Sequence, residues 1–161
     1  MKSAFLYLLL VLMLYACSVR KIPAGQNNKA EEYYSKAWWI LQNTTNSALS
    51  KELATQALHY SDTAIFLNSK DSKYYRVRGT SYYHLKQYDS AISNFSQAII
   101  LDSTNSLAWM NRAIAYENTG RYAIAEPDYL EALKFDPESS TIYFNLGLLY
   151  GKWGKDSLSM L

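Results

Sequence analysis

Few residues in this chain have the types and spacing that catalysis or metal binding requires. His59 and His84 lie 25 positions apart on different predicted helices, and neither has a carboxylate at the spacing of a metal site. The segment Gly151-Lys152-Trp153-Gly154-Lys155 has the glycine and lysine content of a phosphate-binding loop. It lacks the required Gly-x4-Gly-Lys-Ser/Thr spacing, and Asp156 stands where a hydroxyl residue is needed. We therefore expect no enzyme activity, no metal site and no cofactor.

The only cysteine, Cys17, follows a short apolar segment at the amino terminus. Lys2 supplies a positive charge, and the eleven residues from Phe5 to Tyr15 are all apolar. This run is shorter than the roughly 20 residues that a membrane-spanning helix needs. The pattern is therefore typical of an export signal, which we place at residues 1–16.

Residues Leu14-Tyr15-Ala16-Cys17 resemble the lipobox of bacterial lipoproteins, although Tyr15 departs from the usual residue at its position. The resemblance implies cleavage before Cys17 and acylation of that residue, which would give a stable lipid anchor. No Asp precedes Asp62 in the sequence. By the sorting habits of such lipoproteins, the absence of an aspartate close after the cysteine implies an outer membrane location facing the periplasm. The alternatives are an ordinary secretory signal with an incidental cysteine, or an uncleaved anchor.

The composition limits the class of protein. The 161 residues suffice for one domain, and the formal net charge is only +2. No basic stripe runs along the sequence, which argues against a nucleic acid partner. A single cysteine excludes a disulfide within the chain. The 15 tyrosines and 4 tryptophans are many for this length, and we assign most of them to a repeated core.

A pattern of small and aromatic residues recurs every 34 residues. In the central unit, Gly120 separates two predicted helices, and Asp136-Pro137 ends the second one. One face of the first helix carries Trp109, Ala113 and Tyr116. One face of the second helix carries Ala125, Tyr129 and Ala132. The preceding unit has Tyr75, Gly79, Tyr82, Ala91, Phe95, Ala98 and Asp102, and the following one Tyr143, Gly147 and Tyr150. Such a period indicates stacked helix–turn–helix repeats, in which small residues let paired helices approach closely.

These positions resemble the tetratricopeptide repeat, whose units carry an aromatic, a small residue and Tyr in the first helix, then Ala, an aromatic and Ala in the second. The match covers Ser72 to Pro137, continues to about Gly154 as a half repeat, and reaches back to Ala30. The resemblance implies an all-α fold in which these helix–turn–helix repeats stack into a short right-handed solenoid.

The repeat register predicts where each part of the chain begins and ends. Residues 17–29 form the lipidated cysteine and a polar tether, residues 30–154 about three and a half repeats, and residues 155–161 a tail. We expect helices at Ala30–Gln42, Ser47–Leu67, Ser72–Lys86, Asp89–Leu101, Ser106–Asn118, Tyr122–Phe135 and Ser139–Lys152. The first pair has eight extra residues, which predict a longer turn or helix. Pro127 predicts a local kink or a late helix start.

In this family the first helix of each pair lines a concave groove that holds a peptide or a partner helix. Carried over position by position, the resemblance implies a groove lined by Tyr34, Trp38, Arg76, Thr80, Tyr83, Met110, Asn111, Ile114, Phe144, Asn145 and Leu148. Asn111 and Asn145 stand where related repeats bind backbone amides, because a side-chain amide both donates and accepts. The alternative is that asparagine is simply common there.

The carboxylate clamp of chaperone-binding repeats is only half matched. Arg76 and Asn111 agree with it, whereas Thr80, Thr141 and Asn145 do not. The apolar and aromatic groups of the predicted groove favour a hydrophobic or helical partner segment instead.

The last predicted helix, Ser139–Lys152, has no second helix after it. We expect Tyr143, Leu146 and Tyr150 to face the missing helix and to form a C-terminal contact face. This face would bind a second copy as a two-fold dimer, or a helix supplied by the partner. The alternative is that the tail folds back and covers it.

Two functions from different classes fit these features. The first is a lipid-anchored adaptor or scaffold that holds another envelope protein or peptide in its groove. The second is a lipoprotein that binds a small molecule or a glycan in the aromatic-lined groove. An open groove would favour the adaptor, and an enclosed pocket would favour the small-molecule protein.

Overall fold

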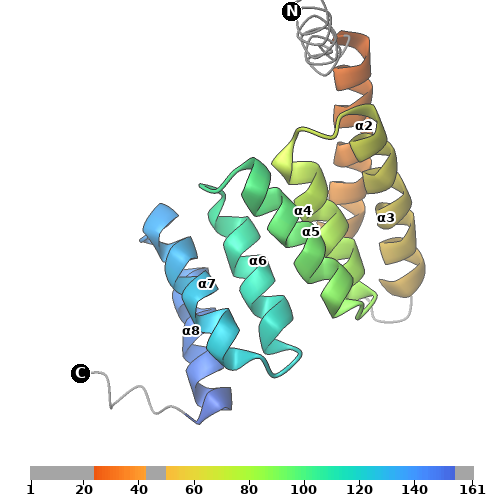
Figure 1. Ribbon diagram of the computed structural model, residues 1–161. Helices are drawn as coiled ribbons and strands as arrows, with labels where there is room; N and C mark the ends of the chain where they lie inside the picture. Colours follow the sequence, from red (N-terminus) through yellow and green to blue (C-terminus); the bar gives the residue numbers. More distant parts are fainter. Residues whose placement is uncertain (1–23, 43–49, 155–161) are drawn as a thin grey trace, which may run out of the picture.

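The computed structural model describes residues 24–42 and 50–154 of the chain (Figure 1). Over these residues the chain forms helices and no β-strand: α2 (Ala24–Gln42), α3 (Ser50–Leu67), α4 (Ser72–His84), α5 (Tyr88–Leu101), α6 (Ser106–Glu117), α7 (Tyr122–Phe135) and α8 (Ser140–Trp153). The predicted all-α fold is confirmed. The predictions for the signal peptide, Cys17, the turn of the first pair and the tail lie outside the described residues.

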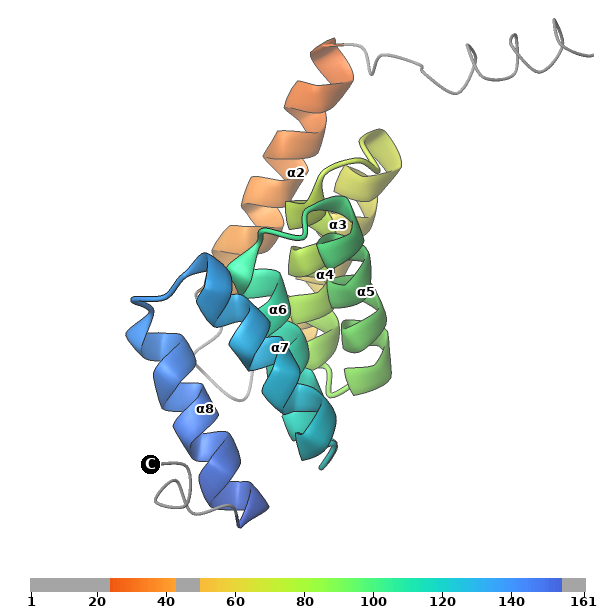
Figure 2. The same cartoon turned by 60° about the vertical axis from the view of Figure 1, so that its left-hand side comes forward.

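The helices stack in antiparallel pairs, α2 with α3, α4 with α5 and α6 with α7, and α8 follows at the end (Figures 1 and 2). The first helices α2, α4, α6 and α8 contact one another in series, whereas α3, α5 and α7 do not touch each other within the described residues. The first helices therefore line the tighter, inner side of a curved array. None of the described helices has the length and apolar character needed to cross a membrane.

Helix α2 begins six residues earlier than the sequence predicted, at Ala24 rather than Ala30. The segment from Gly25 to Lys29 is exposed, so it lacks the apolar periodicity by which a helix is recognised. Extending an existing helix costs little once its first turn has formed. The side chain of Asn68, which precedes α4, also holds the new segment, because its Nδ2 donates to Asn27 Oδ1 at 2.9 Å.

The predicted close approach of paired helices at small residues is confirmed in the core. A Cβ atom added to Gly79 on α4 would lie 2.6 Å from Cε1 of Phe95 on α5, and Phe95 is only 1% exposed. One repeat later Ala113 and Tyr129 are both fully buried in the same cluster. The small residue lets an aromatic ring lie directly against the backbone of the first helix, which brings the pair together.

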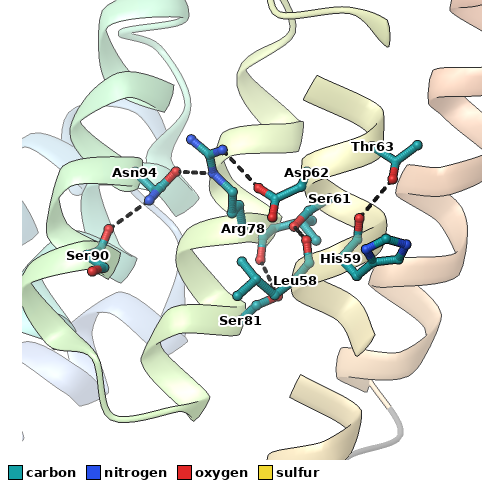
Figure 3. A network of polar contacts seen from close by, with 10 residues as sticks. Leu58, His59, Ser61, Asp62, Thr63, Arg78, Ser81, Ser90 and Asn94 are labelled. Carbon is teal, nitrogen blue, oxygen red and sulfur yellow. Dashed lines mark hydrogen bonds and ion pairs between the residues drawn. The ribbon is translucent and has the colours of Figure 1, made fainter. Parts of the chain in front are cut away.

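Arginines that the sequence analysis passed over join neighbouring pairs. Arg78 on α4 donates from Nη1 to Asp62 on α3 at 3.0 Å and from Nε to Asn94 on α5 at 2.6 Å (Figure 3). One repeat later, Arg112 on α6 donates to Ser96 on α5 at 3.0 Å and to Asp128 on α7 at 2.7 Å. Each arginine thus fills the gap between two second helices that do not touch each other.

Pro127 lies inside α7, which begins at Tyr122. The predicted late start of this helix is therefore wrong. Pro127 lacks the N–H that would bond the carbonyl of Ala123, but both residues are exposed. Water can satisfy that carbonyl, so the helix tolerates proline there.

Candidate functional site

Four of the predicted groove residues lie around one cavity on the inner side of the array. The cavity has a volume of about 140 Å³ and is lined by Thr80, Tyr83, His84, Phe95, Asn111 and Ile114. Helix α4 supplies the first three of these residues and α6 the last two. The register of the repeat assigned Thr80, Tyr83, Asn111 and Ile114 to the groove, and the cavity brings them together with His84 and Phe95, which the register did not assign.

Phe95 reaches the cavity from α5, a second helix, because Gly79 has no side chain to block it. A Cβ atom at Gly79 would overlap the Phe95 ring, with contacts of 2.6 and 2.7 Å. The same contact that closes the core thus brings an apolar ring to the cavity. The sequence signal for this residue was the conjunction of a glycine on α4 with a phenylalanine 16 positions later.

The side chain of Tyr83, which lines the cavity, is held in place by three neighbouring side chains. Its hydroxyl accepts a hydrogen bond from Asn118 Nδ2 at 3.1 Å, and its ring packs edge-on against His84 at 5.9 Å and Tyr88 at 5.6 Å. Burial raises the pKa of Tyr83, which keeps the hydroxyl protonated at neutral pH. Desolvation lowers the pKa of His84, which favours its neutral form. The cavity therefore presents neutral polar groups beside apolar ones.

Asn111 has the chemistry of a ligand-binding residue. It is half-buried at the cavity, and within the described residues its side-chain amide makes no hydrogen bond. A side-chain amide offers two donors and one accepting oxygen. The equivalent amide, Asn145, donates instead to Sδ of Met110 at 3.8 Å. The two asparagines that share a repeat position thus differ, and Asn111 is the one free to bind.

Arg76, which we expected to be exposed in the groove, is only 8% exposed. Its guanidinium lies over the ring of Trp38 at 4.9 Å. Desolvation lowers the pKa of Arg76, and Tyr34 partly offsets this effect. No carboxylate among the described residues forms an ion pair with it. The prediction of exposure failed because α2 places a tryptophan over α4 at this point.

The α8 end of the groove is apolar. Phe144 is 66% exposed and Leu148 is 44% exposed, whereas Met110, which contacts Asn145 on the same helix, is buried. Ile114 on α6 adds a half-buried apolar side chain. The groove therefore has a cationic and aromatic end at α2 and α4, and an apolar end at α6 and α8.

The predicted C-terminal contact face is only partly open. Leu146 is 8% exposed and belongs to the core cluster of Ala125 and Tyr129, so its assignment to that face is wrong. It occupies the repeat position of Arg112, which contacts both Ser96 of the preceding pair and Asp128 of its own pair. Tyr150 is half-buried and donates to Glu126 at 2.8 Å, while Tyr143 is 55% exposed.

A second cavity lies outside the groove, between α2 and α3. It has a volume of about 660 Å³ and is lined by Glu32, Ser35, Lys36, Trp39, Ile40, Leu53, Gln56 and Tyr60. Trp39 is 66% exposed there. The adjacent pair Trp38-Trp39 was the missed signal, because consecutive residues of a helix point in different directions and cannot both face the groove.

Comparison with known proteins supports the same architecture. Residues 106–139 match the family model described as the tetratricopeptide repeat. No curated protein matches the sequence. The Arabidopsis OM64 TPR domain is similar in structure, with a TM-score of 0.67 and 24% identity over 79% of this chain and 98% of that chain.

Two further solved structures show the same fold. The Sgt2 TPR domain from Aspergillus fumigatus has a TM-score of 0.67 and 17% identity, covering 78% of this chain and 80% of that one. The second TPR domain of human RPAP3, solved with the HSP70 peptide SGPTIEEVD, has a TM-score of 0.65 and 18% identity, covering 79% and 97%. The protein therefore contains a tetratricopeptide repeat at residues 106–139, within an all-α solenoid of the tetratricopeptide type.

Proposed function

We propose that this protein is a membrane-anchored adaptor that binds a protein or peptide partner in its concave groove. The observation that carries the proposal is the cavity of about 140 Å³ beside the uncommitted amide of Asn111. A backbone-binding amide next to an apolar recess is the arrangement that holds an extended peptide and selects one of its side chains.

The cavity sets the size and character of the anchoring side chain. A volume of about 140 Å³ accommodates one aliphatic side chain, with Phe95 below it and Ile114 beside it. Asn111 then donates to a carbonyl of the ligand and accepts from its N–H. The exposed side chains of Phe144 and Leu148 offer apolar contacts to the residues that follow.

The other end of the groove favours a ligand with an acidic group. The buried guanidinium of Arg76 keeps a positive charge near the inner surface of α2 and α4 without an internal carboxylate partner. A ligand carboxylate there would offset the desolvation of that charge. The RPAP3 domain in its complex with an acidic HSP70 peptide gives a precedent for peptide capture by this fold.

The cellular setting of the adaptor rests on the sequence alone. Cys17 lies outside the described residues, and its lipidation is part of the proposal. Acylation there would tether the repeats to the bacterial outer membrane, facing the periplasm, and would hold the bound partner in the cell envelope.

Site-specific photo-crosslinking in the producing cell tests the groove. A photoreactive amino acid at Ile114 should capture a partner, and the Asn111→Ala change should abolish that adduct. The matched control is Ile100, which is 75% exposed on α5 and should give no specific adduct. Equal adducts at both positions, or an Ile114 adduct that survives Asn111→Ala, would place the partner elsewhere.

A second candidate function is binding of a small molecule or glycan, and the cavity between α2 and α3 favours it. Its exposed Trp39 lies beside Glu32, Lys36 and Gln56, and an aromatic face with polar neighbours suits a sugar ring. A glycan array with wild-type protein and Trp39→Ala tests this function. Glycans retained equally by both proteins, or by neither, argue against it.

A further inference from the structure

Large apolar side chains are exposed along one edge of the helix array. Phe66 is 88% exposed and Ile100 is 75% exposed, and each is the last residue but one of its helix, α3 or α5. Leu101 and Phe135, which end α5 and α7, are also exposed, as is Leu107 in the first turn of α6. We call these five residues the apolar edge.

The repeat gathers these residues on one side. Phe66 and Ile100 are 34 residues apart, as are Leu101 and Phe135, so each pair shares a repeat position. Figures 1 and 2 show that the turns from α3 to α4, from α5 to α6 and from α7 to α8 follow one edge of the array. The turns from α4 to α5 and from α6 to α7, at the opposite edge, expose Lys86, Gln87, Asn118, Thr119 and Gly120. The two edges therefore differ in apolar character at their turns.

The expected lipid anchor attaches beside the apolar edge. Helix α2 begins at this edge, at Ala24 (Figure 1), and Asn27 in its first turns hydrogen-bonds Asn68, two residues after Phe66. Cys17 precedes Ala24 by seven residues. Seven residues span at most about 25 Å when fully extended. An acylated Cys17 would therefore hold this edge close to the bilayer surface.

We propose that the apolar edge inserts into the lipid bilayer interface and so holds the repeats against the membrane in one orientation. This orientation depends on the acylation of Cys17, which belongs to the function proposed above. The side chains of Phe66 and Ile100 would enter the boundary between headgroups and acyl chains, about 5–10 Å deep. Lys134, which follows Ile100 by 34 residues, is exposed, and its long side chain would reach the headgroups.

The spacing of these side chains favours lipid over a protein as the occupant. Within the described residues α3, α5 and α7 do not contact one another, so Phe66, Ile100 and Phe135 belong to separate helices rather than to one packed surface. A protein interface needs a continuous, closely packed surface. A bilayer accepts apolar side chains one at a time, because lipid tails adapt to each of them.

Apolar insertion, rather than charge, has to supply the binding free energy. The turns of this edge carry charges of both signs, namely Lys70, Asp71, Asp102, Asp136 and Glu138. Two of the carboxylates already have partners in the protein. Asp71 lies 3.2 Å from the ammonium of Lys73, and Asp102 accepts a hydrogen bond from the Thr104 hydroxyl at 2.7 Å. Vesicles of uncharged phosphatidylcholine are therefore a suitable probe, since they exclude attraction to anionic lipid.

This orientation leaves the groove cavity accessible. Tyr83 and His84, which line the cavity, lie at the end of α4, whereas Ser72 begins that helix at the apolar edge. The twelve residue steps from Ser72 to His84 correspond to about 18 Å along the helix axis. A partner could therefore enter the cavity from the side that faces away from the bilayer.

Spin labelling of the acylated full chain tests the proposal. Cys17 is the only cysteine, so after its acylation an introduced cysteine is the only free thiol. The labelled variants are Phe66→Cys and Ile100→Cys. The matched control is Lys51→Cys, because Lys51 is exposed on the same helix as Phe66 and about 22 Å from it along the axis. Electron paramagnetic resonance measures how often each label collides with oxygen, and with a water-soluble nickel complex, in phosphatidylcholine vesicles.

We expect the labels at Phe66 and Ile100 to collide more with oxygen, which concentrates in lipid, and less with nickel than the label at Lys51. Ile100→Ser should then raise nickel collisions of the label at Phe66, because it removes a neighbouring inserted side chain. It should not lower the thermal midpoint, since Ile100 is 75% exposed. The matched control Ile124→Ser changes an exposed apolar residue at the start of α7 and should leave the label at Phe66 unaffected.

Three outcomes would overturn the proposal. Few collisions with both reagents at Phe66 and Ile100 would show that a protein, either a second copy or a partner, covers the edge. Nickel collisions as frequent at Phe66 and Ile100 as at Lys51 would show that the edge stays in water, and the anchored adaptor would still stand. An intact mass without acyl chains on Cys17 would overturn the anchor together with this orientation.

Discussion

Arg112 and Asp128 form a two-pronged ion pair between α6 and α7. Nε and Nη2 of the arginine donate to the two carboxylate oxygens at 2.7 and 2.8 Å. The Asp128 side chain is only 7% exposed and that of Arg112 is 18% exposed. This hydrogen bonding raises the pKa of Arg112, so its guanidinium stays charged. The ring of Trp109 also lies against the guanidinium at 4.9 Å.

Breaking this ion pair should cost far more than breaking its counterpart one repeat earlier. Asp128→Ala leaves a largely buried arginine unpaired and should lower the free energy of unfolding by about 3 kcal/mol. The matched change is Asp62→Ala, because Asp62 is 51% exposed where it pairs with Arg78. It should cost less than about 1 kcal/mol. Urea unfolding measures both, and equal losses would contradict the difference in burial.

The two glycines at equivalent positions should respond oppositely to alanine. Gly79→Ala brings a methyl group against the Phe95 ring and should destabilise the protein by about 1–3 kcal/mol. Gly147→Ala meets open space and should be neutral or stabilising by up to about 1 kcal/mol, because alanine favours helix. Thermal unfolding measures the pair. A loss at Gly147 as large as at Gly79 would show that α8 is covered.

Partner binding should depend on Asn111 without a change in stability. Asn111→Ala removes a half-buried amide that makes no internal hydrogen bond, so the melting temperature should stay the same. Binding of a groove partner should weaken by about 1–2 kcal/mol. Arg76→Glu is not a clean test of the groove, because it would bury a carboxylate and remove the stacking on Trp38. Affinity unchanged by Asn111→Ala would exclude this amide from the site.

Alkaline pH should destabilise the protein through Tyr150. Burial and the hydrogen bond to Glu126 raise the pKa of Tyr150 to about 12, above the value of about 10 in an unfolded chain. The stabilisation is complete below pH 10 and is lost as pH rises through 12, because the unfolded chain releases the proton first. Tyr150→Phe should lose less stability than wild type between pH 9 and 12 in urea titrations. Parallel curves would contradict the assignment.

Membrane attachment should depend on Cys17. Cys17→Ala should release the protein to the soluble fraction and abolish labelling with a fatty acid analogue, because the acyl chains anchor the protein. Fractionation at high salt separates a lipid anchor from electrostatic adsorption. A Cys17→Ala protein that still sediments with membranes would identify Phe5–Tyr15 as an uncleaved anchor.

The sequence predicted those features that depend on one repeat at a time. The 34-residue register identified Gly79 as a position where the paired helices approach closely, and the structure shows that the Phe95 ring lies against it. The register assigned Leu146 to the wrong face of its helix. The first helix of a pair packs against both its own second helix and the preceding pair, and the spacing of apolar residues alone does not distinguish these two faces.

Features that join different pairs escaped prediction. The repeat register assigned Arg76 to the groove, but in the structure Trp38 of α2 covers its guanidinium. This contact involves the irregular first pair. The arginine bridges were overlooked although they have a regular spacing, since Arg78 and Arg112 each bond residues 16 positions before and after. A search for polar residues at that spacing would have found them.

The arginine bridges also determine how cooperatively the array unfolds. In a linear stack each unit is stabilised only by its neighbours, so the links between units set whether it melts as one body or frays from an end. Arg78 and Arg112 tie three second helices together, but the next position in the series is Leu146, which makes no such bridge. Helix α8 depends instead on apolar packing and on the ion pair of Lys152 with Glu117 at 2.7 Å. Amide hydrogens of α8 should therefore exchange first, and the molecule should lose its order from that end.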